Sequence, residues 1–338
     1  MNRDDLSFLK QFGYAKFPRI LQIEITKDCP FSCPQCYKPS SDSCHMDFDR
    51  LKNLLSAIEN KCKGISFNGG EPMVYPYIYD LLNFIQGKNF DVYVYSSGYG
   101  VDKNFCSTIK RNSRLNYYIS LNGSTKEIND LSRQGYSVAI QAMETMTESG
   151  VDYGIVWVAR HDNVNDFPNI IDLARYYNIS HIAVISNRLT GEGIIDSPLD
   201  GDDLTKLASI IKGKEACEPY IWVDNCFSDL IVALGNHMKG LPMRCLAGIN
   251  RCTVNYDFSF QPCTHLHYAE KFESLEDYWN DSETLRTLRT HQYSDGGLCR
   301  LCLNKKRCFP CRAANKDLYE HIETYVSKCM NFSCDRRK

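Results

Sequence analysis

The chain is 338 residues long, 43% of them hydrophobic, and its formal net charge is −2 at pH 7, so it can bury one large core or two smaller ones. Lysine and arginine are scattered along the chain, which argues against a nucleic-acid partner. Residues 1–20 lack the basic and apolar character of a signal peptide, and no later run approaches a membrane span. We therefore expect a cytoplasmic protein without a membrane partner.

Short runs rich in β-branched and aromatic residues alternate with helical patterns along the first two thirds of the chain. Six strands are predicted, at residues 21–25, 64–67, 91–95, 116–121, 153–158 and 181–185. Between the first two strands, one face of a predicted helix carries Leu51, Leu54, Leu55 and Ile58. Strands separated by helices predict an α/β fold with a parallel sheet, closed or partly closed into a barrel; an open doubly wound sheet is the alternative.

Seventeen cysteines are a large number for a cytoplasmic chain, and closely spaced cysteines in a reducing compartment more often bind metal than form disulfides. Three lie at residues 29–36, directly after the first predicted strand, and eight lie between residues 245 and 329. The other six are isolated, and we expect most of them to be small buried side chains: Cys44, Cys62, Cys106, Cys217, Cys226 and Cys334.

The first cysteine group, Cys29, Cys33 and Cys36, has the spacing Cys-x3-Cys-x2-Cys. A closed zinc site needs four ligands, and only His45 is nearby to complete it. Three thiolates on a 4Fe–4S cluster instead leave one iron open to another ligand. This spacing after a first strand resembles the radical S-adenosylmethionine (SAM) enzymes. The resemblance implies a partial (β/α)6 TIM-type barrel and a cluster that cleaves SAM to a 5′-deoxyadenosyl radical, which abstracts hydrogen from a substrate.

The stretch FNGGEP at residues 67–72 follows the second predicted strand and is similar to the GGEP segment of that family. The similarity implies that Gly69 and Gly70 let the backbone approach SAM and that Glu71 lies near its amine. A Gly-Gly turn closed by proline is the alternative interpretation of the same four residues.

Weaker similarities extend to other loops of the predicted barrel. Ser120 resembles the family's SAM-contacting serine at a strand end, and the same similarity implies that Arg133 meets the SAM carboxylate. Ser97 lies where the family often has a Thr-Asn-Gly turn. The family's aromatic residue before the third cysteine is absent, because this chain has Gln35 there, followed by Tyr37 after the cysteine.

The second cysteine group lies in the C-terminal third, where a zinc ribbon would use only some of its members. Its spacing, with the CLAG and QPC stretches, resembles the SPASM extension found on many radical SAM enzymes. The resemblance implies two auxiliary 4Fe–4S clusters, hence three in all. The first would be bound by Cys245, Cys252, Cys263 and Cys311, and the second by Cys299, Cys302, Cys308 and Cys329.

These resemblances divide the chain into an N-terminal segment (1–18), a radical SAM partial barrel (19–220), a connecting segment (221–243) and a SPASM domain (244–338). A multi-cluster electron carrier and a zinc-rich interaction protein are the non-enzymatic alternatives.

SPASM enzymes mostly modify ribosomally made peptides, which implies oxidative modification or crosslinking of such a substrate; a dehydrogenase or tailoring enzyme for a small molecule is the alternative. A flavodoxin- or ferredoxin-type protein would supply electrons. No leader-binding domain is expected before the first strand, so a leader peptide would need a separate binding protein or the barrel itself.

Few residues suggest proton or hydrogen transfer. Sulfatase-maturating members carry an aspartate after the cysteine matching Cys263, where this chain has Thr264 and then His265, so that activity is disfavoured. His265 is a candidate base, although a polar loop is the favoured interpretation. Cys217 and Cys226 are candidate hydrogen donors for an epimerisation, with a buried packing role as the alternative.

Overall fold

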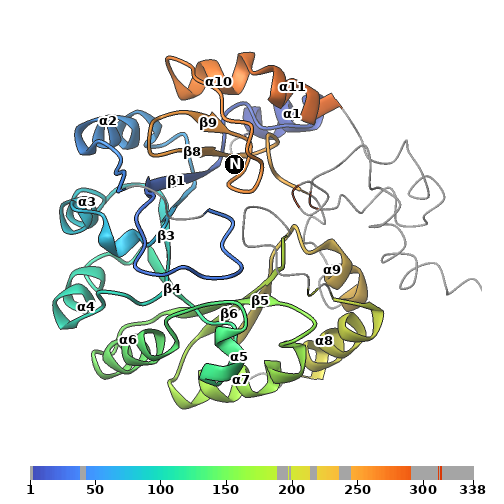
Figure 1. Ribbon diagram of the computed structural model, residues 1–338. Coiled ribbons are helices and arrows are strands. Elements are labelled where there is room, and N and C mark those ends of the chain that lie inside the picture. Colours follow the sequence, from blue (N-terminus) through green and yellow to red (C-terminus); the bar gives the residue numbers. More distant parts are fainter. Residues whose placement is uncertain are drawn as a thin grey trace, which may run out of the picture.

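A curved sheet forms the centre of the molecule, and helices surround its outer side (Figure 1). The computed structural model describes residues 3–38, 43–188, 197, 199–213, 219–235, 245–290, 311 and 313. In this part of the chain the strand order is β7-β6-β5-β4-β3-β2-β1-β8-β9, and only the β8–β9 pair is antiparallel. The strands are β1 (Ile20–Thr26), β2 (Gly64–Gly69), β3 (Asp91–Ser96), β4 (Leu115–Ser120), β5 (Gly154–Ala159), β6 (His181–Ser186), β7 (Tyr220–Val223), β8 (Arg251–Val254) and β9 (Phe260–Gln261).

Most of the helices follow strands of the sheet and pack against its outer face (Figure 1). The α-helices are α1 (Arg3–Phe12), α2 (Phe48–Ile58), α3 (Ile78–Phe84), α4 (Lys103–Ile109), α5 (Lys126–Asp130), α6 (Tyr136–Glu148), α7 (Phe167–Tyr176), α8 (Gly201–Gly213), α9 (Ser228–Leu234), α10 (Leu275–Asp281) and α11 (Glu283–Thr290). Short 3-10 helices cover Pro72–Val74 and Val164–Asp166. Helix α2 is the one expected after the first strand, and it buries Leu51, Leu55 and Ile58.

The strand order from β1 to β7 follows the sequence, without the reversal that defines a doubly wound sheet. The partial barrel predicted from the sequence is therefore confirmed, and the open doubly wound alternative is wrong. All six predicted strands are present, as β1 to β6. Sequence analysis did not predict β7, β8 or β9, which are at most four residues long. Strands β7 and β8 extend the sheet beyond residue 220, where the barrel was expected to end.

Strand β1 separates the hydrophobic core from a polar barrel interior. Its residues Leu21, Ile23 and Ile25 are fully buried in the main hydrophobic cluster. Because successive side chains of a strand point to opposite faces, Gln22 and Glu24 face the interior of the barrel. The alternation in the sequence LQIEIT therefore predicts both faces of this strand.

The segment after β9 packs back onto the N-terminal part of the chain. Trp279 of α10 is fully buried, and its indole Nε1 donates a 2.8 Å hydrogen bond to the carbonyl oxygen of Ala15. The guanidinium of Arg289 in α11 donates to the carbonyl oxygens of Gly248 and Trp279, both at 2.8 Å. Residues 245–290 are thus joined to the barrel by both sheet pairing and side-chain contacts.

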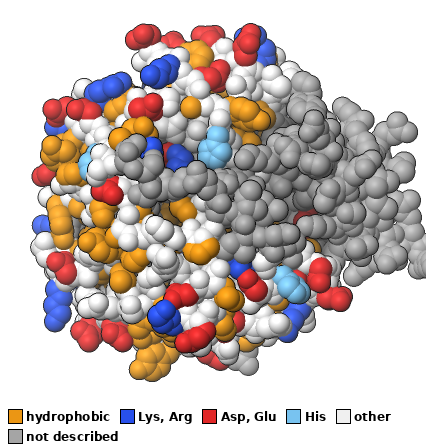
Figure 2. All heavy atoms as spheres, viewed as in Figure 1, with side chains coloured by type: hydrophobic (Ala, Val, Ile, Leu, Met, Phe, Trp, Pro, Cys, Tyr) orange, Lys and Arg blue, Asp and Glu red, His pale blue; other side chains and the backbone are white. Residues whose placement is uncertain are grey.

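The face of the molecule seen in Figure 2 carries acidic and basic side chains interspersed around its rim. Such mixing gives little net field toward a polyanion. No helix in the described part of the chain is long and apolar enough to cross a membrane.

Candidate active site

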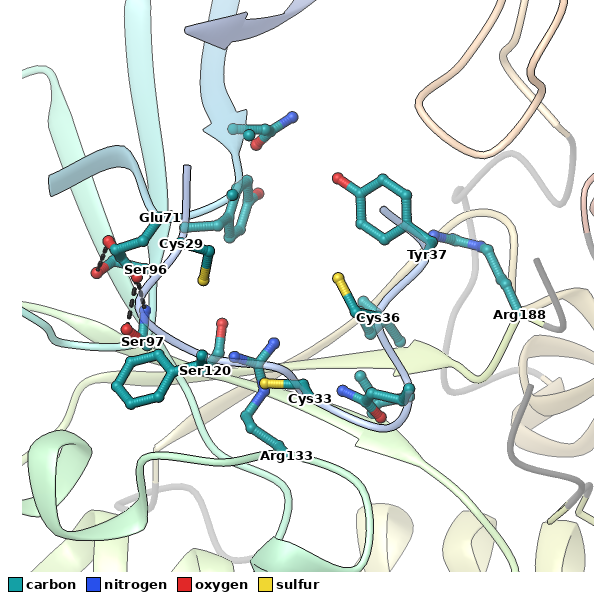
Figure 3. Close-up of a pocket in the computed structure, with 18 of the residues that line it drawn as sticks. Cys29, Cys33, Cys36, Tyr37, Glu71, Ser96, Ser97, Ser120, Arg133 and Arg188 are labelled. Atoms are coloured by element: carbon teal, nitrogen blue, oxygen red, sulfur yellow. Dashed lines mark hydrogen bonds between the residues drawn. The ribbon is translucent and has the colours of Figure 1, made fainter. Parts of the chain in front are cut away.

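The loop after β1 brings three thiols to one cavity at the carboxyl edge of the sheet (Figure 3). Cys29, Cys33 and Cys36 all line this cavity, whose volume is about 190 Å³. Burial raises the pKa of the Cys29 thiol to about 11 and also raises the pKa of Cys36. Both thiols would therefore release a proton on binding a metal, because the thiolate is the ligand.

Backbone hydrogen bonds hold the start of this loop against the loop that follows β2. The amide of Gly70 donates to the carbonyl oxygen of Thr26 at 2.9 Å, and the amide of Glu71 donates to that of Asp28 at 2.8 Å. The amide of Asp28 donates to the hydroxyl oxygen of Thr26 at 3.0 Å. The position of Cys29, one residue further on, is set by these bonds.

The two glycines of the GGEP stretch are required by this close approach. A Cβ on Gly69, whose φ is +147°, would lie 2.1 Å from the carbonyl oxygen of Thr26. A Cβ on Gly70 would lie 2.1 Å from the carbonyl oxygen of Asp28. No other residue fits at either position without moving the backbone that precedes Cys29.

The other end of the cysteine loop is held by residues 132–134. The amide of Gln134 donates to the sulfur of Cys33 at 3.4 Å, and the amide of Gln35 donates to the carbonyl oxygen of Ser132 at 3.1 Å. These contacts place Arg133 in the wall of the cavity, below Cys33 in the view of Figure 3. The Nε atom of Arg133 is buried without a hydrogen-bond partner among the described residues.

Glu71 is 2% exposed and is the centre of a hydrogen-bond network drawn in Figure 3. Its Oε1 accepts from the hydroxyl of Ser96 at 2.7 Å and from the amide of Met73 at 3.2 Å, and its Oε2 accepts from the amide and hydroxyl of Ser97 at 2.7 and 2.5 Å. Burial raises the carboxyl pKa, and the bonds from Ser97 and Ser96 oppose that rise. Four donors fill the four lone-pair positions of a carboxylate, so a ligand amine would have to turn a serine hydroxyl aside.

All residues expected to contact SAM lie around this same cavity. They come from the loops or ends of β2, β3 and β4 and from the segment after α5, and they are Gly69, Gly70, Glu71, Ser97, Ser120 and Arg133. Loops at the carboxyl ends of parallel strands meet at one edge of a sheet, which explains the convergence.

Three aromatic side chains line the cavity although the expected aromatic position is Gln35. The amide oxygen of Gln35 accepts a 2.8 Å hydrogen bond from Asn122, while the rings of Phe31, Tyr37 and Tyr95 face the cavity. Sequence analysis did not identify Phe31 or Tyr95 as functional. The position of Phe31 within the cysteine motif could have indicated it.

A second, smaller cavity of about 50 Å³ is lined by four thiols: those of Cys226, Cys245, Cys263 and Cys311. The thiol of Cys226 is close enough to those of Cys245 and Cys311 for hydrogen bonding. The sequence analysis expected three of these cysteines together, but it did not expect Cys226, which does not line the first cavity.

Cys252, which was expected to be a ligand of the first auxiliary cluster, lines neither thiol cavity. It pairs with Leu21 across β1 and β8, and like Leu21 it is fully buried in the main hydrophobic cluster, as is Cys62. The next residue, Thr253, points to the barrel interior and contacts Gln22 at 3.4 Å. Strand alternation therefore turns Cys252 away from the cavity.

Five further candidate residues lie outside the described part of the chain: Cys217, Cys299, Cys302, Cys308 and Cys329.

Arg188 and His265 line both cavities and form the wall between them. Nη1 of Arg188 donates to Nε2 of His265 at 3.0 Å, and Nη2 is paired with Asp224. Because a guanidinium can only donate, Nε2 must be the acceptor and the imidazole is neutral. Burial, together with the charge of Arg188, holds the pKa of His265 well below its usual range. The ring of His265 also lies 4.3 Å from that of Tyr37, between centroids.

The donor chemistry of the two cavities fits an iron–sulfur cluster. Three thiols line the first cavity and four line the second, and cysteine thiolates are the ligands of 4Fe–4S clusters. Among the described residues, a group of three ligand atoms within 4.8 Å of one another is formed by His161, Asp200 and Asp203.

Residues 23–174 match the Radical SAM superfamily. The matched segment runs from β1 into α7 and includes the cysteine loop and the GGEP stretch. The part of the chain that holds the candidate site is therefore similar to the radical SAM superfamily.

Two curated relatives and one solved structure illustrate the similarity. Fe-coproporphyrin III synthase of Methanosarcina barkeri is 25% identical over 265 residues, 74% of this chain and 60% of that protein. This chain thus spans less than two thirds of that relative. Mycofactocin maturase MftC of Mycobacterium tuberculosis is 23% identical over 309 residues, 86% of this chain and 77% of the maturase. Streptococcus suis SuiB bound to precursor peptide SuiA superposes with a TM-score of 0.74 at 18% identity, over 93% of this chain and 79% of SuiB, which shows a shared fold.

Proposed function

We propose that this protein is a radical SAM enzyme of the SPASM type that abstracts hydrogen from a ribosomally made peptide and oxidises or crosslinks it. The observation that carries the proposal is the convergence of three thiols and the Gly-Gly-Glu loop on one cavity. A second thiol-lined cavity shares Arg188 and His265 with the first and supports a net oxidation.

Within this proposal, Cys29, Cys33 and Cys36 would hold a 4Fe–4S cluster that keeps one iron open for SAM. When bound, the reduced cluster and SAM supply a 5′-deoxyadenosyl radical, which abstracts the hydrogen. Arg133 is suited to bind the SAM carboxylate, because its buried Nε lacks a partner among the described residues. Glu71 supplies negative charge near the SAM amine.

Removal of one hydrogen atom leaves a substrate radical that must lose a further electron, and a proton to solvent, to become a product with two hydrogen atoms fewer. We assign the second thiol cavity, together with the tail cysteines outside the described residues, to two auxiliary 4Fe–4S clusters that accept this electron. The proposed partners are a flavodoxin- or ferredoxin-type reductant and, for a peptide with a leader, a separate leader-binding protein.

The names of the relatives support two substrate classes. MftC is a maturase and SuiB was solved with a precursor peptide, which favours a peptide substrate. The relative from Methanosarcina barkeri is a porphyrin synthase, which favours the alternative of a dehydrogenase or tailoring enzyme for a small molecule.

A direct test is anaerobic incubation of the reconstituted protein with SAM, dithionite and any short peptide found to be encoded beside its gene. We expect 5′-deoxyadenosine to form and one peptide to lose the mass of two hydrogen atoms. A precursor of iron coproporphyrin III serves as the parallel small-molecule substrate, because the Methanosarcina barkeri relative is named for making that porphyrin. If only the porphyrin changes mass, the peptide assignment is wrong; if no 5′-deoxyadenosine forms in any reaction, the enzyme class is wrong.

Replacing Glu71 by alanine should weaken SAM binding while the iron content stays at the wild-type level. The loss of one hydrogen bond to a charged group costs about 1.5 to 3 kcal/mol, or about a ten- to hundred-fold rise in Kd. Anaerobic isothermal titration with SAM measures this change. Glu148→Ala, which removes an exposed carboxylate on α6, is the matched control and should leave Kd unchanged. An unaltered Kd in Glu71→Ala would mean that the GGEP stretch is only a turn.

A further inference from the structure

We propose that Cys226 is the fourth thiolate ligand of the first auxiliary cluster, in place of Cys252. The inference rests on the proposed function, because it takes the second thiol cavity to be a cluster site. The ligand set then has three cysteines of the C-terminal third, namely Cys245, Cys263 and Cys311. The fourth cysteine is contributed by the turn after β7.

The position of Cys226 is fixed by the sheet. It lies in the turn between β7 and α9, two residues after Asp224, whose amide donates to the carbonyl oxygen of Val184 in β6 at 3.0 Å. The amide of Phe227 closes the turn by donating to the carbonyl oxygen of Asp224 at 2.8 Å. The barrel therefore presents this thiol at the carboxyl edge of β7, where it meets Cys245 and Cys311.

The charges around the cavity favour a set of thiolates. The guanidinium groups of Arg188 and Arg251 both line it, and the Nε atom of each is buried without a hydrogen-bond partner among the described residues. Asp224 balances one positive charge through its ion pair with Arg188. Buried cations are stable only when they are paired, and thiolates at this cavity would pair the remaining charge.

Cys252 cannot replace Cys226 without a change of strand register. Its side chain lies on the core face of β8 with Leu21 of β1, whereas Arg251 and Thr253 on either side of it face the barrel interior. Turning Cys252 inward would move its neighbours outward, since side chains of a strand alternate.

The test compares Cys226→Ala with Cys252→Ala in the full chain, each reconstituted anaerobically beside the wild type. Iron, sulfide and the electron paramagnetic resonance spectrum of the dithionite-reduced protein are measured, with thermal melting as a check on folding. We expect Cys226→Ala to lose between about one and about four iron atoms, where four correspond to a whole cluster. It should also lose or alter one auxiliary signal in the spectrum. Cys252→Ala should keep the wild-type iron content and spectrum.

A serine variant keeps the test decisive if Cys226→Ala folds poorly. Cys226→Ser retains the size of the side chain but replaces the sulfur ligand by oxygen, so it should fold and shift one auxiliary signal. Wild-type iron and an unshifted signal in a folded Cys226 variant would overturn the inference, as would loss of a cluster in a folded Cys252→Ala. If the wild type holds only the cluster that depends on Cys29, the auxiliary-cluster proposal itself fails.

Discussion

Simultaneous replacement of Cys29, Cys33 and Cys36 by alanine should abolish formation of 5′-deoxyadenosine. The three thiols converge on the cavity that the Gly-Gly-Glu loop also lines. Without them, no cluster with an iron free to bind SAM can be held there. About four of the about twelve irons expected for three 4Fe–4S clusters should be lost. Iron analysis and chromatography of the products of a dithionite-reduced reaction measure both effects.

The matched control for this variant is Cys106→Ala, which removes a buried thiol from α4, outside both cavities. It should keep the wild-type iron content and rate of SAM cleavage. Cleavage of SAM that persists in the triple variant would rule out the radical SAM mechanism for this protein.

Replacing Gly70 by alanine should have an effect almost as large, although glycine carries no chemical group. The added Cβ would lie 2.1 Å from the carbonyl oxygen of Asp28, so the backbone next to Cys29 must move. Overpacking of this kind costs about 1 to 3 kcal/mol of stability. A displacement of about 1 Å at reacting groups can lower the rate about a hundred-fold. Thermal melting and the rate of SAM cleavage measure the two effects.

Gly213→Ala is the control for this substitution, because a Cβ at the end of α8 meets no heavy atom within 4 Å. It should leave melting temperature and SAM cleavage unchanged. If Gly70→Ala has the same melting temperature and rate of SAM cleavage as Gly213→Ala, the loops after β1 and β2 can move apart without loss of function.

The sequence predicts those parts of the fold that depend on local periodicity. The alternation in LQIEIT defines both faces of β1, and the spacing of Leu51, Leu55 and Ile58 defines the buried side of α2. The loops after the strands then converge because the sheet is parallel. This brings both Glu71 and Arg133 to the cysteine loop, although Glu71 and Arg133 are 62 positions apart in the sequence.

The contacts that the sequence does not predict depend on side-chain direction and on distant segments. Cys252 has the spacing of a ligand, but it lies in a four-residue strand that is too short to show an alternation. Cys226 lies alone in the sequence, and only the packing of β7 and α9 brings it to Cys245. Arg188 was missed for the same reason, since its partners Asp224 and His265 are 36 and 77 residues away.

The pairing of β8 with β1 means that the barrel and the following segment are not exchangeable modules. Ile20 to Ile23 align with Arg251 to Val254, so a chain ending before β8 would leave β1 as an open edge with unpaired amides and carbonyls. The contact between Trp279 and Ala15 would be lost as well. A related C-terminal segment grafted onto this barrel would have to reproduce the register of four residue pairs before its cysteines could reach the cavity.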